Sequence, residues 1–186
     1  LVTANDACDT NVEVVANESS TQGTDPANCN YYNYEIIRTW TATDDCGNTA
    51  MASQTITVED TEGPAITTQA LDVEVECDGT GNVSEVTAWI NNYAGAAATD
   101  DCSNVSWTND YNGNVITDCG NAGVIEVTFT AADACGNTST TIGIFNIIDT
   151  TEPELLGVEQ EITVECDAVP NPPTVTANDI CDDNVA

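Results

Sequence analysis

The chain has 186 residues, of which 32 are acidic and a single one, Arg38, is basic, giving a formal net charge of −31. This charge repels polyphosphates and anionic headgroups, which excludes nucleic acid as a partner and makes acidic lipid surfaces unfavourable. The sequence contains no histidine and no lysine, so catalysis by an imidazole base or a lysine Schiff base is excluded as well.

The nine cysteines predict disulfides rather than a zinc site, because the chain offers neither a histidine nor a Cys-x-x-Cys pair. Disulfides at this density are typical of oxidising compartments, so we expect a secreted, extracellular protein. No run of 18 apolar residues is present, and we expect no membrane insertion in this segment. The sequence opens and closes inside a repeated pattern, which indicates a piece of a longer protein whose targeting segments lie elsewhere.

An eight-residue stretch, found at 41–48 and again at 130–137, sets the organisation of the chain. The cysteines of its two copies, Cys46 and Cys135, lie 89 residues apart, as do Cys77 and Cys166. Each copy stands between two alternating apolar runs, which predicts a β-hairpin closed by a Gly-Asn turn.

We therefore predict tandem domains with this 89-residue period. Residues 1–63 form a repeat that lacks its first strand. Residues 64–151 form a complete repeat, and residues 152–186 hold the opening strands of a third.

Within the complete repeat, the alternating residues 71–77 predict a first strand, of which residues 161–166 are the copy in the next repeat. Residues 84–95 carry apolar side chains at helical spacing, with Ser84 able to cap the start and Gly95 the end, which predicts a short helix. The third repeat has a short proline-rich segment in place of this helix.

Further strands are predicted at 105–107 and 124–131, followed by a return strand that ends at 147–149. Ile125 and Phe129, which match Ile36 and Trp40 in the first repeat, should face the core. Short strands and frequent turns within about 90 residues predict an all-β fold of immunoglobulin-like β-sandwiches, with one short helix inserted in the second repeat.

Three side chains with possible binding roles are expected to be structural. Trp89 and Tyr93 lie on the predicted helix, where packing against the sheet is a more common role than a sugar-binding platform. Arg38 precedes Trp40 by two residues and should pair with a carboxylate or stack on the indole.

Four cysteines per repeat allow three pairings, and spacing alone does not choose among them. An immunoglobulin-like topology favours Cys8 with Cys46, Cys102 with Cys135, and Cys77 with Cys119. The remaining cysteines would then pair outside this chain, Cys29 with a residue upstream and Cys166 and Cys181 with residues downstream.

The same topology gathers acidic side chains where one repeat meets the next. Calcium takes 6–8 oxygen ligands in flexible geometry, so these junctions predict structural Ca²⁺ sites. At the first junction the predicted ligands are Asp60, Glu62, Asp100, Asp101, Asn104 and Asp133. At the second they are Asp149, Glu152, Asp179, Asp182 and Asp183. The alternative is an ordinary solvated acidic surface, because no contiguous calcium-loop motif is present.

Three motifs recur in order: T-x-T-A-T-D-x-C-G-N at 39–48, I-x-V-x-D-T-x-x-P at 56–64, and V-E-C-D at 75–78. Together they resemble the hyalin-repeat-like (HYR-like), immunoglobulin-fold repeats of very large Bacteroidota surface adhesins, of the gliding-motility adhesin type. The resemblance covers most of the chain, because second copies lie at 130–137, 147–153 and 164–167. It implies a secreted, filament-like cell-surface adhesin exported by the type IX system.

The sequence thus favours a non-enzymatic structural or adhesive array. Its partners would be further copies of the repeat in the same chain, with lateral self-association into a filament and an unidentified surface glycan or protein as target. The alternative is a carbohydrate-binding or accessory module of a secreted glycan-degrading enzyme, since paired carboxylates can cleave glycosides. The acids recur with the repeat instead of gathering in one place, which favours the array.

Overall fold

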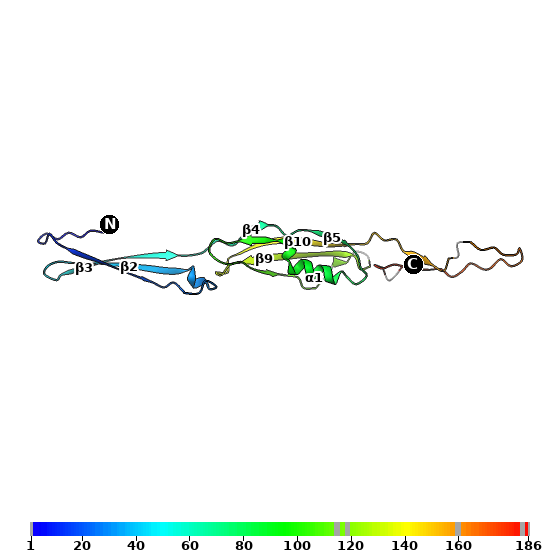
Figure 1. Cartoon of the computed structure of the whole chain (residues 1–186), viewed down its shortest axis with the longest axis horizontal. Helices are drawn as coiled ribbons and strands as arrows, with labels where there is room; N and C mark the ends of the chain where they lie inside the picture. The colour runs from blue at the N-terminus through cyan, green and yellow to red at the C-terminus, as the bar shows by residue number, and fades with distance from the viewer. Residues whose placement is uncertain (1, 114–115, 118–119, 159–160, 183–184, 186) are drawn as a thin grey trace. The chain divides into compact units, whose positions relative to one another are not determined.

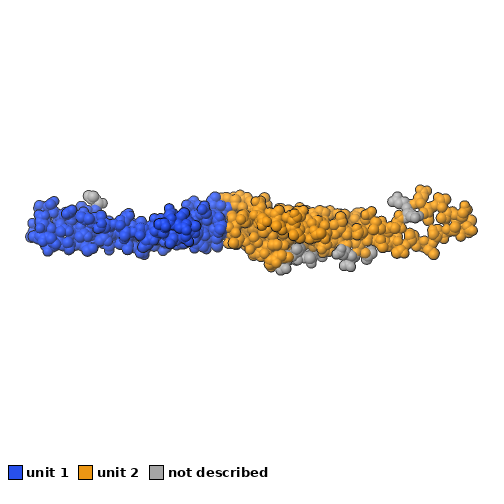
Figure 2. Space-filling model, turned by 60° about the horizontal axis from the view of Figure 1, so that its bottom comes forward, with its two compact units in different colours: residues 1–65, 98–106, 131–139 blue, residues 66–97, 107–130, 140–186 orange. Residues whose placement is uncertain are grey.

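The computed structural model describes residues 2–113, 116–117, 120–158, 161–182 and 185. They fall into two compact units (Figure 2). Unit 1 comprises residues 1–65, 98–106 and 131–139, and unit 2 comprises residues 66–97, 107–130 and 140–186. Two loops of the predicted second repeat, 98–106 and 131–139, thus belong to the same unit as the first repeat.

Unit 1 contains a three-stranded antiparallel sheet in the order β1 (Glu13–Ser20), β2 (Tyr34–Thr43) and β3 (Thr49–Val58) (Figure 1). The predicted hairpin is confirmed: Thr43 lies opposite Thr49, and Gly47 in the turn has φ +84°, a conformation that favours glycine. A short 3₁₀ turn, η1 (Cys29–Tyr31), precedes β2.

The three-stranded sheet of unit 1 buries little. Ile36 and Trp40 are only half-buried, and Met51 is exposed. Arg38 lies opposite Glu18 in the β1–β2 register, and its Nε donates to the Glu18 carboxylate at 2.7 Å. The predicted ion pair of the only basic residue is therefore confirmed.

Unit 2 holds most of the core. The sheet runs β5 (Val73–Glu76), β10 (Thr138–Ile148), β9 (Gly123–Ala132) and β7 (Ser106–Asn109), and the short β8 (Ile116–Thr117) also pairs with β9. Burial alternates along β9, and Ile125 and Phe129 are 2% and 0% exposed. The predicted inward face of this strand is therefore confirmed.

Helix α1 (Val83–Asn91) packs on the core side of this sheet (Figure 1). The indole of Trp89 meets Phe129 and Phe145 edge-to-face, each at 5.5 Å between ring centroids, and its Nε1 donates to the Leu71 carbonyl at 3.0 Å. Tyr93, in the 3₁₀ turn η2 (Tyr93–Gly95), stacks on Trp107. Both aromatic residues of the helical region serve packing, as predicted.

The start of the helix differs from the prediction. Asn82, not Ser84, is the N-cap, and it is in the left-handed region with φ +51°. Its buried side chain donates to the Glu76 carbonyl and accepts from the Asp78 N–H. This side chain therefore fastens the loop after β5 and makes no capping hydrogen bond to the helix, while Ser84 lies inside the first helical turn.

The predicted strand at 161–166 is wrong, since these residues form no strand. The equivalent β5 gains its hydrogen bonds from parallel pairing with β10, with Phe145 opposite Val73. Among the described residues, 161–166 have no such neighbour, and an alternating pattern alone does not supply one. Here β11 (Glu154–Leu156) pairs with β12 (Thr176–Asn178) instead.

The remaining strands, β4 (Ala65–Thr68) and β6 (Ala97–Thr99), form another two-stranded sheet. The all-β prediction with one short helix, inserted in the second repeat, is confirmed. In the described part of the chain, no helix has the length and apolar character needed to span a bilayer.

Candidate functional site

Within the described residues, two disulfides join distant parts of the sequence. Cys29 bonds to Cys135, with 4.4 Å between their Cα atoms and a sequence separation of 106 residues. Cys77 bonds to Cys181, with a Cα–Cα distance of 5.8 Å and a separation of 104 residues. Both separations exceed the 89-residue period, so each bridge connects one predicted repeat to the next.

The predicted pairings are therefore wrong. Cys135 is bonded to Cys29 and not to Cys102, and Cys77 is bonded to Cys181 and not to Cys119, which lies outside the described residues. Cys8 and Cys46, predicted to pair, are free and exposed, as are Cys102 and Cys166. The partners expected outside the chain for Cys29 and Cys181 are likewise wrong.

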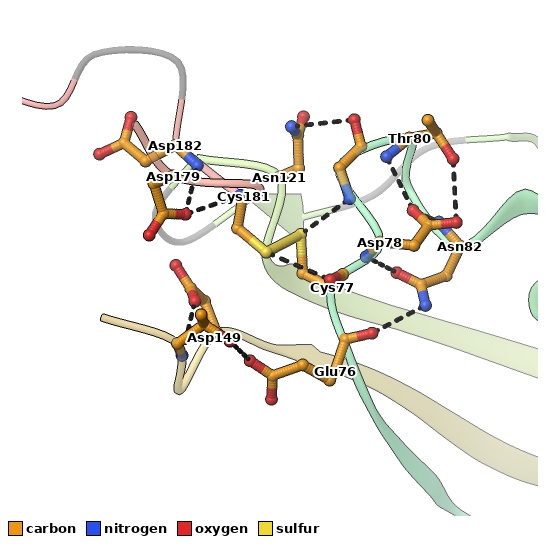
Figure 3. The surroundings of a disulfide bond; sticks show 12 residues. Glu76, Cys77, Asp78, Thr80, Asn82, Asn121, Asp149, Asp179, Cys181 and Asp182 are labelled. Carbon is orange, nitrogen blue, oxygen red and sulfur yellow. Dashed lines mark hydrogen bonds between the residues drawn. A yellow bond between two sulfur atoms is a disulfide. The ribbon is translucent and has the colours of Figure 1, made fainter. Parts of the chain in front are cut away.

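The reason lies in which segments meet. The prediction assumes that each bridge closes a single sandwich. In unit 1, however, the turn between β9 and β10 brings Cys135 to η1, where Cys29 lies. In unit 2, the loop after β12 brings Cys181 to the end of β5 and Cys77 (Figure 3). The loops that were predicted to bring acidic residues of neighbouring repeats together thus also bring these cysteines together.

The turn at 133–137 is closed by its own side chains. Oδ1 of the buried Asp133 accepts the N–H groups of Cys135 and Asn137, each at 2.8 Å, and Oδ2 accepts the Asn137 side-chain amide. In the other hairpin, Asp44 likewise accepts hydrogen bonds from the backbone N–H and the side-chain amide of Asn48. Because both oxygens of Asp133 are occupied, its main role is to shape the turn.

This turn holds the linker that follows β3. The Asn137 amide also donates to the Asp60 carbonyl at 3.1 Å, and the Asp60 N–H donates to Asn33 Oδ1 at 2.6 Å. A Cβ at Gly63 would lie 2.8 Å from the Thr138 carbonyl oxygen, so the linker passes the hairpin at backbone contact. The backbone of Asp60 is consequently fixed from both sides.

The Asp60 side chain is 8% exposed, and its Oδ2 has no hydrogen-bond partner among the described residues. Burial raises the pKa of this carboxyl group above its ordinary value, and the charges of Asp133 and Asp100 raise it further. A backbone hydrogen bond from Glu62 lowers this pKa in part, but a buried carboxylate oxygen without a donor is costly. Asp60 is therefore the side chain whose surroundings most require an additional partner.

Asp60 borders a pocket of about 430 Å³ in unit 1, between residues 59–65 of the linker and residues 99–102 of the following loop. Five carboxylate side chains line it: Glu59, Asp60, Glu62, Asp100 and Asp101. Four of the six ligands predicted for the first junction are thus brought together, with Glu59 in addition. Asn104 is exposed and does not line the pocket.

Backbone hydrogen bonds within its own loop fix the Asp100 side chain. Asp100 Oδ1 accepts the N–H groups of Cys102 and Ser103 at 3.0 and 2.7 Å, which folds the loop into an Asx turn. The Cys102 thiol lines the same pocket. Desolvation, followed by the charges of Asp60 and Asp100, raises the pKa of this thiol, so it stays protonated at neutral pH.

The second predicted junction brings together an equivalent pair of aspartates. Asp149 follows Asp60 by 89 residues, and Asp179 Oδ1 accepts the N–H groups of Cys181 and Asp182, as Asp100 does for its own loop. A carboxylate oxygen of Asp149, one of Asp179 and the Cys181 sulfur lie within 4.8 Å of one another (Figure 3).

The Cys181 sulfur belongs to a disulfide, so this cluster offers only carboxylates to a cation. Of the other ligands predicted at this junction, Glu152 is exposed and Asp182 is half-buried. Asp183 lies outside the described residues.

No protein-family model matches the sequence, and a search of curated proteins finds no match.

Sequence reasoning missed the groups that position Asp60. Asn33 follows η1, and nothing in its local sequence marks it as a contact of the linker. Asn137 was detectable, because it repeats Asn48 at the close of the second hairpin. Its second hydrogen bond, to Asp60, depends on the tertiary fold.

Proposed function

We propose that this chain is a non-enzymatic structural and adhesive segment of a long secreted surface protein. The observation that carries the proposal is the order of the bonded cysteines. Along the chain they follow as Cys29, Cys77, Cys135 and Cys181, with the first bonded to the third and the second to the fourth. The two covalent loops therefore interlace.

Interlaced loops suit a chain that is pulled from its ends. Tension can pass from Cys29 directly to Cys135, or along the backbone to Cys77 and from there to Cys181. Either route bypasses most of the chain between residues 29 and 181. Each bridge also removes conformational entropy from the unfolded state, about 4–5 kcal/mol for loops of roughly a hundred residues in the chain-entropy model.

The charge supports an extracellular surface role. With a formal net charge of −31, copies of the chain repel one another at low ionic strength, which keeps them soluble and separate. Screening by salt or divalent ions reduces this repulsion and permits lateral association into a filament. Disulfides are typical of oxidising compartments, in agreement with secretion.

The resemblance to HYR-like repeats of Bacteroidota adhesins supports the adhesive part of the proposal. Further copies of the repeat in the same chain would be its principal partners, and the target would be a surface glycan or protein. The two aromatic residues considered for a sugar-binding platform are used in packing, since Trp89 is 8% exposed and Tyr93 stacks on Trp107. This use of the aromatics favours the array over a carbohydrate-binding module.

Pulling the chain by its two ends tests the structural role. The oxidised chain should stop far short of the length that the reduced chain reaches. An oxidised chain that extends fully would show that the bridges carry no tension, and the proposal would then be wrong. Screening against a glycan array tests the alternative, since saturable binding of one sugar class would replace the array with a carbohydrate-binding module.

A further inference from the structure

We propose that the pocket of unit 1 binds a divalent hard cation, Ca²⁺, with Asp60 as the central ligand and Glu62, Asp100 and Asp101 as further ligands. The principal site lies within unit 1, and the inference would stand if the chain were not part of an adhesive array. The cation would hold the linker at 59–65 against the loop at 99–102.

An acidic cluster by itself does not indicate a metal site, because solvated carboxylates are common on acidic proteins. Asp60 supplies the second observation. Its side chain is 8% exposed and lines the pocket, and its Oδ2 lacks a hydrogen-bond donor among the described residues. Asn33 and Asn137 hold its backbone on both sides, which fixes the position from which the carboxylate extends. A cation in the pocket would give this oxygen the partner it lacks.

No side chain of the protein can neutralise the cluster. The sequence contains a single basic residue, Arg38, and its guanidinium is paired with Glu18 on the β1–β2 sheet at 2.7 Å. Five carboxylates around a pocket of about 430 Å³ therefore have no cationic partner from the chain. Like charges around one pocket repel one another, most strongly at Asp60, which alone among them is buried, and a divalent ion offsets that repulsion.

The ligand chemistry selects the type of ion. The lining of the pocket includes five carboxylates and two threonines, all hard oxygen donors, beside one cysteine, and the chain has no histidine. Calcium accepts 6–8 such oxygens in irregular geometry, whereas magnesium requires near-ideal octahedral geometry and keeps most of its waters. The pocket has room for an ion with several waters, and its carboxylates come from two separate segments with no octahedral arrangement imposed, which favours calcium.

The repeat gives independent support. The pair Asp60 and Asp100 recurs as Asp149 and Asp179, and the second aspartate of each pair forms the same Asx turn before a cysteine. In unit 2, carboxylate oxygens of this second pair lie within 4.8 Å of each other, a spacing that one ion can bridge. We therefore expect a second ion per chain at Asp149 and Asp179, bound more weakly because that pair is less buried than Asp60.

The test is calorimetric titration of the oxidised full chain with CaCl₂, after removal of metals with EDTA. About 0.15 M KCl should be present, because it screens diffuse counter-ion binding at a Debye length of about 8 Å. We expect saturable binding of two ions, with MgCl₂ at least tenfold weaker.

The decisive variant is Asp60→Asn, which keeps the shape of the side chain and removes its charge. It should weaken the tighter site at least tenfold and leave the second site unchanged. Asp45→Asn is the matched control, because it removes one exposed charge from the turn between β2 and β3 of the same unit, away from the pocket residues. Cys102→Ser should leave the affinity unchanged, which would exclude a thiolate ligand.

Equal affinities for the native chain, Asp60→Asn and Asp45→Asn would overturn the proposal, as would calcium binding that disappears in 0.15 M KCl. If Asp60→Asn fails to fold, as judged by circular dichroism, the exposed Glu62→Gln takes its place, with a smaller loss of affinity expected. Terbium luminescence gives a second readout: Tyr31 and Tyr32 border Asp60, so Tb³⁺ bound there should be sensitised by tyrosine. Absence of a sensitised signal that Ca²⁺ displaces would also contradict the site.

Discussion

The interlaced disulfides predict how far the chain can be stretched. A fully reduced chain of 186 residues should extend to about 650 Å, at roughly 3.5 Å per residue. With both bridges intact, the shortest covalent route runs from the N-terminus to Cys29, across to Cys135, along to Cys181 and on to the C-terminus. This route contains about 80 residues, so the oxidised chain should stop at about 280 Å.

Either bridge alone should limit the extension almost as much as both together. With only Cys29–Cys135 the taut route again contains about 80 residues, and with only Cys77–Cys181 it is longer by about two, roughly 7 Å. The double variants Cys29→Ser/Cys135→Ser and Cys77→Ser/Cys181→Ser should each keep the short limit, and only the quadruple variant should reach the full length. The two bridges are therefore redundant.

The assay is optical-tweezers extension with handles at both ends, after alkylation of the free thiols, before and after addition of reductant. The alternative pairings Cys8–Cys46, Cys77–Cys119 and Cys102–Cys135 would leave a taut route of about 106 residues, or about 370 Å. An oxidised length near 370 Å would refute the observed connectivity. A double variant that extends to about 650 Å would show that the other bridge does not form.

Three further results are expected from the described contacts. Trypsin has one possible cleavage site, Arg38. After cleavage of the oxidised, denatured chain, the two fragments should stay together on a non-reducing gel because Cys29–Cys135 joins them. The fragments should separate in the Cys29→Ser variant but not in the Cys77→Ser variant. Trp89→Ala should lower the free energy of unfolding by about 3–5 kcal/mol, measured by urea denaturation. The reason is that Trp89 is only 8% exposed and packs against two Phe rings. Val83 is exposed on the same helix, so the control Val83→Ala should change the free energy of unfolding by less than about 0.5 kcal/mol. Hydrogen bonds from the backbone N–H of Thr150, then from its hydroxyl, lower the pKa of Glu76 below its ordinary 4.5. The ionised Glu76 therefore stabilises the fold above that pH, and the stabilisation is lost as the pH falls through the lowered pKa; Glu76→Gln should flatten the acid limb of the stability curve, and an unchanged limb would contradict this assignment.

Local pattern was sufficient for much of the fold. Period-two alternation at 124–131 correctly placed Ile125 and Phe129 in the core, because a strand with one buried face must alternate. The Gly-Asn signature located both hairpin turns, since few residues other than glycine adopt a positive φ cheaply. At 161–166 the same alternation failed, because a strand also requires a neighbour with free backbone groups, and no local pattern encodes that neighbour.

The candidate site likewise depends partly on local sequence and partly on the tertiary fold. The gathering of Asp60, Glu62, Asp100 and Asp101 was predicted only with an immunoglobulin-like topology assumed, and the pocket of unit 1 brings them together. The sequence by itself determined the 89-residue period and the all-β class with one helix. These follow from residue types at fixed spacing, which act locally or recur with the repeat.

Only the tertiary structure decided which cysteines bond and which carboxylate is buried. A period states how often a cysteine recurs, but bonding requires Cα atoms within about 4.4–6.8 Å, and the fold brings only Cys29 to Cys135 and Cys77 to Cys181 among the described residues. Likewise, Asp60 differs from the exposed acids around it only because Asn33 and Asn137, 27 and 77 residues away in sequence, enclose its backbone. Contacts over such distances arise from the chain folding back on itself, so they could not be read from local sequence.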